Sequence, residues 1–143
     1  MTIILLMTNQ KDIMIHEVDR DIMMHEVDRY IIPVRALSFN VGYRIMRNRF
    51  ITSEKGRDYK KQIVDFFERL PDKRCHTTKI KLSIDFFLKT NRKMDIDNIT
   101  KLFIDACKGI LYRDDDLVYE FHARKFIGQI NNEIHVEIEQ VPI

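Results

Sequence analysis

The sequence predicts an α/β (α+β) fold in which a small mixed β-sheet of about four strands is covered by two helices. Residues 78–87 alternate between apolar and polar side chains, which is the pattern of a half-buried strand. Residues 53–70 and 97–109 repeat apolar side chains at helical spacing. With 143 residues, 45% hydrophobic and 32% charged, the chain has the size and composition of one globular domain.

The N-terminal part of the chain contains a tandem duplication. Residues 12–20 are followed directly by a second copy, residues 21–29, which differs at one position. A nine-residue step places the two copies on opposite faces of a strand or helix, so the added copy cannot simply extend an amphipathic element. We therefore expect residues 1–29 to form a flexible extension and residues 30–143 to form the domain.

The first half of this domain is predicted to contain one strand, one loop and one helix. Tyr30 to Val34 is strand-like, and Arg35 to Ile51 has the composition of a basic loop with interspersed aromatic residues. Thr52 or Ser53 is a suitable N-cap for the helix that follows, and Pro71 ends it. The apolar stripe of this helix consists of Tyr59, Ile63, Phe66 and Leu70.

The second half is predicted to contain a strand, a helix and a β-hairpin. The alternating strand turns its apolar residues (Ile80, Leu82, Ile84 and Phe86) to one side. Asp97 is placed to start the second helix, as its N-cap or just before the N-cap, and the helix ends near Gly109. Its apolar face carries Ile99, Phe103, Ala106 and Ile110. Val118 to Ile127 and Glu133 to Val141 then form two strands that we expect to pair as a hairpin.

Charge is distributed unevenly along a chain whose net charge is only +2. Residues 35–61 contain eight Lys or Arg and two acidic residues, a net of +6. Basic side chains that alternate with aromatic ones can hold phosphates and stack on exposed bases. This segment therefore predicts contact with a polyanion, although a solvated basic loop is the simpler alternative.

Two groups of aspartates flank the second predicted helix. Asp95 and Asp97 are two residues apart, so in an extended segment their carboxylates lie on one side. Asp114, Asp115 and Asp116 follow the helix, and one of them can join the first pair if the chain folds back.

Oxygen ligands of this kind suit Mg²⁺, with Mn²⁺ as an alternative. Lys101, one turn beyond Asp97, could stabilise charge on a phosphate there. Helix capping, a solvated acidic turn and an ordinary i, i+4 ion pair are the corresponding structural explanations.

Taken together, these residues resemble the core of the RusA family of Holliday-junction resolvases. The resemblance runs over three separate segments, from about Tyr30 to Val141. Its residues in this sequence are Ser38, Asn40, Tyr43, Arg44, Arg47, Arg49, Ser53, Tyr59, Asp95, Asp97, Asn98, Lys101, Asp105, Asp114 and Asp115. The usual prolines before the loop are replaced here by Ala36 and Leu37.

The resemblance implies a role for each matching residue. Asp95, Asp97 and Asp115 would be the metal-binding catalytic acids, and Lys101 would be needed for activity. Contacts with DNA are expected from Asn40, Tyr43, Arg44, Arg47, Arg49 and Lys93. The implied partners are a four-way DNA junction and a second copy of the chain in a homodimer.

The leading hypothesis is therefore a Mg²⁺-dependent endodeoxyribonuclease that resolves four-way junctions by paired nicks, in DNA recombination and repair. A junction-binding protein whose nuclease is silent is the alternative. A cation-binding interaction domain that uses residues 114–116 is a third possibility, but it assigns no role to the basic segment.

The sequence also indicates the compartment. No apolar run approaches the roughly 20 residues that a membrane-spanning helix needs, and the N-terminus has no signal-peptide pattern. Cys75 and Cys107 are isolated thiols without metal-ligand spacing, which suits a reducing environment. We expect a cytoplasmic protein without a membrane partner.

Overall fold

A computed structural model describes residues 10–15, 24–90 and 94–142 of the chain. The strands are β1 (Gln10–Ile15), β2 (Met24–Ile32), β3 (Tyr43–Met46), β4 (Arg49–Thr52), β5 (Ile80–Leu88), β6 (Val118–Ile127) and β7 (Glu133–Gln140). The helices are α1 (Phe39–Gly42), α2 (Glu54–Glu68), α3 (Ile96–Cys107) and the short 3₁₀ helix η1 (Asp115–Leu117).

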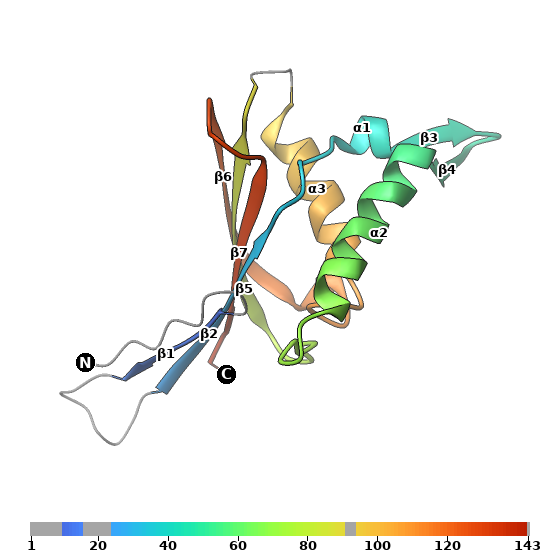
Figure 1. The fold of residues 1–143 in the computed structure, drawn as a ribbon. Coiled ribbons are helices and arrows are strands. Elements are labelled where there is room, and N and C mark those ends of the chain that lie inside the picture. Colours follow the sequence, from blue (N-terminus) through green and yellow to red (C-terminus); the bar gives the residue numbers. More distant parts are fainter. Residues whose placement is uncertain (1–9, 16–23, 91–93, 143) are drawn as a thin grey trace.

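A mixed sheet forms the centre of the molecule, with strand order β1-β2-β7-β5-β6. Strand β5 pairs with β7 antiparallel and with β6 parallel, while β2 pairs antiparallel with both β1 and β7. Helices α2 and α3 cover one face of this sheet (Figure 1). The predicted mixed sheet of about four strands under two helices is thus confirmed, and β1 adds a fifth strand.

Strand β2 starts earlier than the sequence indicated. It begins at Met24 and not at Tyr30, and it runs across the boundary that we expected after residue 29. The second copy of the duplication therefore contributes residues to the sheet, and β1 in the first copy pairs with it. The flexibility predicted for residues 1–29 stays a prediction, and residues 1–9 and 16–23 of that range lie outside the described residues.

The expected hairpin between the last two strands is wrong. Strand β5 lies between β6 and β7, so these two strands do not pair with each other. Helix α3 connects β5 to β6, and a strand–helix–strand connection of this kind places the second strand parallel beside the first. Helix α3 consequently runs back along the sheet, and its two ends lie at opposite ends of β5 and β6.

Helix α2 begins where the sequence predicted. The Ser53 hydroxyl accepts a hydrogen bond from the Gly56 amide at 3.0 Å, which satisfies one of the free donors in the first turn. The buried stripe contains Tyr59 and Ile63 as expected. It continues with Phe67, while the predicted Phe66 is half-buried beside it.

Helix α3 begins earlier than expected, because Asp95 is its N-cap and Asp97 lies in the first turn. The predicted apolar face is confirmed by Ile99, Phe103 and Ala106, all buried. Just past the end of the helix, Gly109 has φ of 81°, a left-handed conformation that glycine adopts without steric cost.

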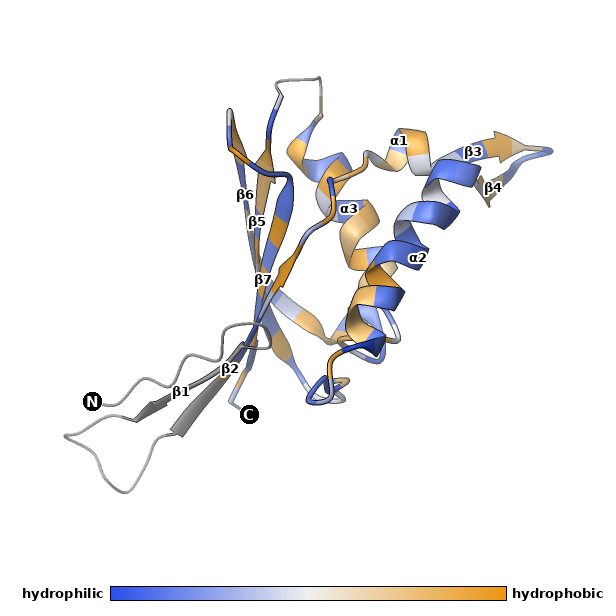
Figure 2. Ribbon diagram, in the orientation of Figure 1, coloured by the Kyte–Doolittle hydropathy of each residue, from blue (hydrophilic) through white to orange (hydrophobic). Residues whose placement is uncertain are grey.

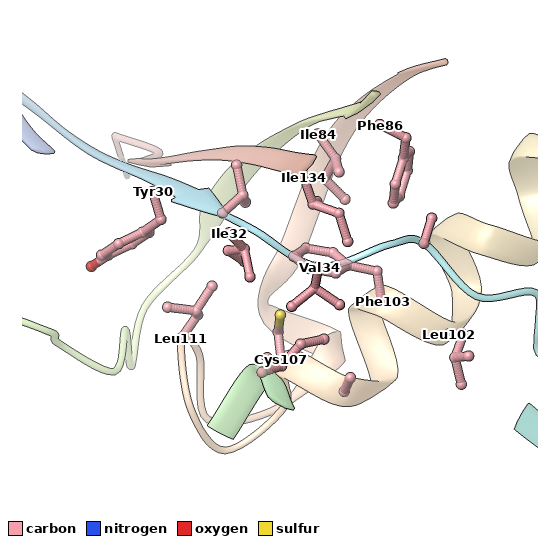
Figure 3. Close-up of a cluster of buried hydrophobic side chains, with 14 of the residues drawn as sticks. Tyr30, Ile32, Val34, Ile84, Phe86, Leu102, Phe103, Cys107, Leu111 and Ile134 are labelled. Carbon is pink, nitrogen blue, oxygen red and sulfur yellow. The ribbon is translucent and has the colours of Figure 1, made fainter. Parts of the chain in front are cut away.

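The hydrophobic core lies between the sheet and the two long helices (Figure 3). Tyr30 packs edge-on against Phe67 with ring centroids 5.0 Å apart, and Phe86 packs against Phe103 at 6.0 Å. Full burial of such side chains contributes about 1.5–3 kcal/mol each. Figure 2 shows hydrophobic residues on the facing sides of the sheet and helices, with a more hydrophilic outer side on α2.

A buried polar cluster joins β2 to the segment between α2 and β5. Asp28 is 1% exposed, and its Oδ2 accepts hydrogen bonds from Arg74 Nε and His76 Nε2, each at 2.8 Å. His76 is buried as well, with 7% of its surface exposed. A buried carboxylate keeps its charge when such donors satisfy it, so the second copy of the duplication is anchored to the domain.

The segment predicted as a basic loop contains helix α1 and a β-hairpin. Strands β3 and β4 pair with each other as a separate two-stranded sheet, which projects from the molecule beside α2 (Figure 1). Their two-residue turn, Arg47 and Asn48, has φ of 51° and 62°. Such turns favour Asn-Gly, so the Arg-Asn pair gave no clear hairpin signal.

The close approach of α1 to α2 depends on Gly56. A Cβ atom at this position would lie 2.2 Å from the Gly42 carbonyl oxygen, which also accepts a hydrogen bond from the Ser53 amide. We expect Gly56→Ala to displace α1 and to lower the free energy of unfolding by about 1–3 kcal/mol, as overpacking does. Thermal denaturation checks this, with Lys55→Ala at the exposed neighbouring position as control. An unchanged melting temperature in Gly56→Ala would contradict it.

Candidate active site

A cavity of about 670 Å³ lies alongside α3. Its apolar walls come from α1, the hairpin, α3 and β6, and its charged residues come from α3 and η1. The lining residues are Phe39, Tyr43, Phe50, Ile96, Asp97, Thr100, Lys101, Ile104, Asp105, Asp115, Phe121 and Ala123. Of the four predicted catalytic residues, Asp97, Lys101 and Asp115 therefore share one cavity, and Asp95 is not among its lining residues.

The N-terminal end of α3 carries the first pair of aspartates. Asp95 and Asp97 are both exposed, and Asp97 Oδ1 accepts a hydrogen bond from the Asn98 amide at 2.9 Å. The partial positive charge of a helix N-terminus favours carboxylates at this position. The first turn of α3 therefore stabilises the negative charge of both carboxylates.

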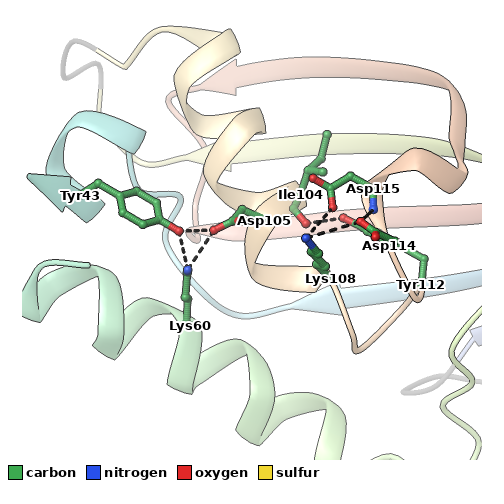
Figure 4. A network of polar contacts seen from close by, with 8 residues as sticks. All are labelled: Tyr43, Lys60, Ile104, Asp105, Lys108, Tyr112, Asp114 and Asp115. Carbon is green, nitrogen blue, oxygen red and sulfur yellow. Dashed lines mark hydrogen bonds and ion pairs between the residues drawn. The ribbon is translucent and has the colours of Figure 1, made fainter. Parts of the chain in front are cut away.

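The other end of α3 carries the second acidic group. Lys108 Nζ lies 3.5 Å from Asp114 Oδ1 and 3.7 Å from Asp115 Oδ1 (Figure 4). A hydrogen bond from the Asp115 amide and the charge of Lys108 lower the pKa of Asp114. The neighbouring charges of Asp114 and Asp115 raise the pKa of Lys108. Asp115 is therefore held beside the C-terminal end of the helix.

The two acidic groups do not come together within the chain, contrary to the expectation that one of the later aspartates joins Asp95 and Asp97. Asp105 follows Asp97 by eight positions in α3, about 12 Å along the helix axis, and Asp115 lies near Lys108, in the direction of the helix C-terminus. Among the described residues, no group of three or more His, Cys, Asp or Glu is close enough to hold one metal ion. The two groups are apart because β5 and β6 are parallel. The chain leaves the end of β5 and has to return along α3 to the opposite end of the sheet before β6 starts.

Lys101 lies one helical turn from Asp97 on the exposed side of α3. Its ammonium is 4.1 Å from the centre of the Phe39 ring, a cation–π contact. Phe39 also packs against Tyr43 and Phe50, with centroids 4.6 and 5.9 Å apart. Sequence reasoning counted Phe39 among the aromatic residues of the basic segment that could stack on bases. It did not predict the contact with Lys101, since an aromatic residue in a predicted loop does not reveal which cation it will meet.

The predicted DNA-binding residues lie mainly on α1 and the hairpin. Asn40, Arg44, Arg47 and Arg49 are exposed. Tyr43 is half-buried at the base of the hairpin, and its hydroxyl bonds with Asp105 and Lys60 inside the molecule (Figure 4). Lys93 lies outside the described residues.

A second hollow, of about 450 Å³, lies on the face of the sheet that the helices leave open. Two ion pairs cross between strands in this hollow: Arg124 donates two hydrogen bonds of 2.8 Å to Asp85, and Arg29 lies 2.8 Å from Glu137. None of the predicted catalytic acids lines it. The cavity along α3 is therefore the better candidate for an active site.

Comparison with known proteins agrees with this choice. The sequence model of a protein family described as endodeoxyribonuclease RusA matches residues 35–139, a stretch that contains the hairpin, both long helices and all four predicted catalytic residues. The chain belongs to the RusA family. A search of curated proteins finds no match. This RusA-family protein is accordingly a nuclease that hydrolyses DNA.

Two further features of the RusA-family protein are its helix lengths and its two cysteines. No helix in the described part of the chain has both the length and the apolar character needed to cross a bilayer. Cys107 is fully buried, and burial raises the pKa of its thiol, whereas Cys75 is exposed. Neither cysteine is among the residues that line the cavity.

Proposed function

We propose that this protein is a Mg²⁺-dependent endonuclease that resolves four-way DNA junctions by paired nicks. The observation that carries the proposal is the shared cavity, in which Asp97, Lys101 and Asp115 lie beside a projecting basic hairpin in a nuclease of the RusA family. Junction specificity, metal dependence and dimerisation are inferences that go beyond the membership of that family.

The chemistry of the donors fits a hard cation. Asp95, Asp97 and Asp115 are exposed carboxylates, and Mg²⁺ binds through one or two carboxylates together with waters and substrate phosphate oxygens. Asp95 and Asp97 alone meet that number at one end of α3. When bound, the ion would supply an activated water and stabilise the leaving oxygen of an in-line displacement.

The chain's own residues supply positioning and charge. Lys101 is exposed beside Asp97, where its ammonium can neutralise negative charge that develops on the scissile phosphate. Arg44, Arg47 and Arg49 on the hairpin can hold backbone phosphates of the DNA arms. Exposed Phe50 lies on the same hairpin, and its ring can stack on an unpaired base.

A homodimer accounts for two features of the proposal. Two opposed strands of a junction have to be cut, and a two-fold dimer presents two equivalent sites. Within one chain Asp115 lies at the far end of α3 from Asp95 and Asp97. A second copy could bring its own Asp115 to that pair. Strand β6, at the end of the described sheet, carries exposed Tyr119 and Phe121 and is a candidate surface for this contact.

Mixing two inactive variants tests whether the site is shared between copies. In the proposed dimer, each site combines Asp95 and Asp97 of one chain with Asp115 of the other. A heterodimer of Asp97→Asn and Asp115→Asn chains therefore has one site that carries both substitutions and one site that is intact. A co-expressed equal mixture should therefore recover about a quarter of the wild-type sites, since half of random dimers are mixed and each has one intact site. The recovered product should be a single nick, measured on a junction labelled on each strand in turn.

A matched mixture serves as control. Asp95→Asn combined with Asp97→Asn should recover nothing, because both substitutions affect the same half of the site. If differently tagged chains show that heterodimers form and the first mixture still cuts nothing, the shared site is excluded.

The function itself is tested with a synthetic four-way junction in Mg²⁺, beside a linear duplex of the same sequence. Symmetric nicks in the junction alone support the resolvase. Tight junction binding across salt concentrations without any cutting in Mg²⁺ or Mn²⁺ supports the silent binder instead. Equal cutting of the duplex would reject junction specificity and leave a general endonuclease.

A further inference from the structure

Three side chains from three different elements meet at the wall of the cavity. Tyr43 comes from the base of the hairpin, Lys60 from α2 and Asp105 from α3 (Figure 4). Lys60 Nζ lies 2.5 Å from the Tyr43 hydroxyl oxygen and 2.9 Å from Asp105 Oδ2, and the Tyr43 hydroxyl donates to the same carboxylate oxygen. Each group therefore contacts the other two.

The protonation states agree with this geometry. Burial alone would raise the pKa of Asp105, but hydrogen bonds from Tyr43 and Lys60 outweigh it and lower that pKa. Burial lowers the pKa of Lys60, and its contacts with Tyr43 and Asp105 raise it to a larger extent. Burial and the neighbouring carboxylate raise the pKa of Tyr43. At neutral pH the three groups are an anion, a cation and a neutral donor.

The position of this network matters because the hairpin is attached mainly to α2. The Ser53 amide and hydroxyl donate to the carbonyls of Gly42 and Val41, and Arg57 donates to the Thr52 carbonyl at 2.8 Å. These contacts hold the base of the hairpin to the start of α2. They do not fix its angle relative to α3, the helix that carries Asp97 and Lys101.

The Tyr43–Asp105 contact provides a direct polar link between the hairpin and α3, in addition to the contact of Lys101 with Phe39. Tyr43 is half-buried, whereas the rest of β3 is exposed, so its side chain is the point at which this strand enters the molecule. Asp105 lies two turns beyond Asp97 on the same side of α3, and both line the cavity. Lys60 adds α2 to the same contact.

We propose that Lys60 and Asp105 are positioning residues that, through the Tyr43 hydroxyl, hold the basic hairpin at a set angle to the acidic residues of the cavity. The inference rests on the proposed DNA cleavage, and it assigns a role to Lys60, which no sequence pattern singled out. DNA held by the hairpin is then presented to Asp97 and Lys101 in a defined position.

The expected effects on stability and on cleavage rate differ in size, and this difference separates a positioning role from simple stabilisation. The Lys60 and Asp105 side chains are 30% and 37% exposed, and ion pairs of that exposure contribute little to overall stability. A misplacement of about 1 Å between substrate and catalytic groups, in contrast, can reduce a rate by about 100-fold. Loss of the network should therefore affect cleavage far more than folding.

The chain offers a matched control one residue away. Lys61 and Asp65 form an ion pair on α2 with the same N–O distance, 2.9 Å, but on its exposed side. The test compares Lys60→Met, Asp105→Asn and their double variant with Lys61→Met and Asp65→Asn. For each protein we would measure single-turnover cleavage of the saturated junction complex, melting temperature, and amide hydrogen exchange of residues 43–52.

Lys60→Met and Asp105→Asn should each lower the cleavage rate by about 10- to 100-fold. The double variant should lose no more than either single one, because both substitutions break the same network. Exchange should accelerate in residues 43–52 and stay unchanged in β5 and β7, with melting temperatures lowered by less than about 4 °C. Both control variants should keep the wild-type exchange and melting temperature, and Asp65→Asn should also cut at the wild-type rate. Lys60→Arg should restore part of the rate that Lys60→Met loses.

Three results would overturn the proposal. These are wild-type cleavage and exchange in Lys60→Met, additive losses in the double variant, or a loss of protection throughout the sheet that matches the loss of rate. The exchange measurement needs no nuclease activity. If wild type cuts no DNA, the proposed function fails, while the exchange data still show whether the network holds the hairpin.

Discussion

Asp97→Asn is expected to reduce junction cleavage in Mg²⁺ by at least about 100-fold, since even residues that support metal ligands cost 10- to 100-fold when changed. The carboxylate lies at the N-terminal end of α3, lines the cavity and is one turn from Lys101. An asparagine side chain has nearly the same shape as aspartate and fits the same position in the helix, but it lacks the negative charge that a hard cation requires. The measurement is the single-turnover rate with protein in excess over the labelled junction.

The affinity of Asp97→Asn for the junction should not fall with the cleavage rate. Removal of a negative charge from a surface that faces DNA lowers electrostatic repulsion, so Asp97→Asn should bind the junction at least as tightly as wild type at low salt. Asp116→Asn makes the same change of charge in an exposed residue that does not line the cavity, and it should cut at the wild-type rate. Cleavage by Asp97→Asn at the rate of this control would remove Asp97 from the proposed site.

Asp28→Ala is expected to cause the largest loss of stability, about 3–5 kcal/mol, as removal of one partner from a buried ion pair usually does. The carboxylate is almost fully buried, and without it the buried His76 ring loses its acceptor. For a chain of this length such a loss lowers the melting temperature by roughly 10 °C. Denaturant unfolding followed by circular dichroism would measure it, with Asp72→Ala, an exposed residue nearby, as control.

The contribution of Asp28 should also depend on pH in one direction. Burial opposes ionisation, but hydrogen bonds from His76 and Arg74 outweigh it, so the pKa of Asp28 lies below its ordinary value of 3.8. A carboxyl whose pKa is lower in the folded state stabilises the protein fully above its unfolded pKa. That stabilisation is lost as pH falls through the folded value. The stability difference between wild type and Asp28→Asn should therefore shrink below about pH 3.8, and a constant difference would contradict the ion pair.

Local patterns were sufficient for the long elements of the domain. The alternation of Ile80, Leu82, Ile84 and Phe86 identified β5, and all four residues are buried. Helical spacing identified α2 and α3 and the core faces of both, because a side chain's position on a regular element follows from its place in the sequence. The same regularity placed Asp97 and Lys101 one turn apart on an exposed helix face.

Pairing between elements could not be obtained in this way. Strands β6 and β7 were predicted as a hairpin because they are neighbours in sequence, but the crossover through α3 inserts β5 between them. The Arg47–Asn48 turn concealed the hairpin of β3 and β4. Likewise, Asp28 belongs to the duplicated segment that we expected to be a flexible extension, and its role depends on Arg74 and His76, more than forty residues away.

The sequence by itself determined the family, the long helices and strands of the domain and the identity of the candidate acids, because each depends on residue type and local spacing. Tertiary structure alone decided how those acids are arranged. The parallel pairing of β5 with β6 makes α3 span the sheet, so Asp97 and Asp115 line opposite ends of one cavity. It also decided that Tyr43, Lys60 and Asp105 meet, since contacts between three elements far apart in sequence leave no periodic signal in any one of them.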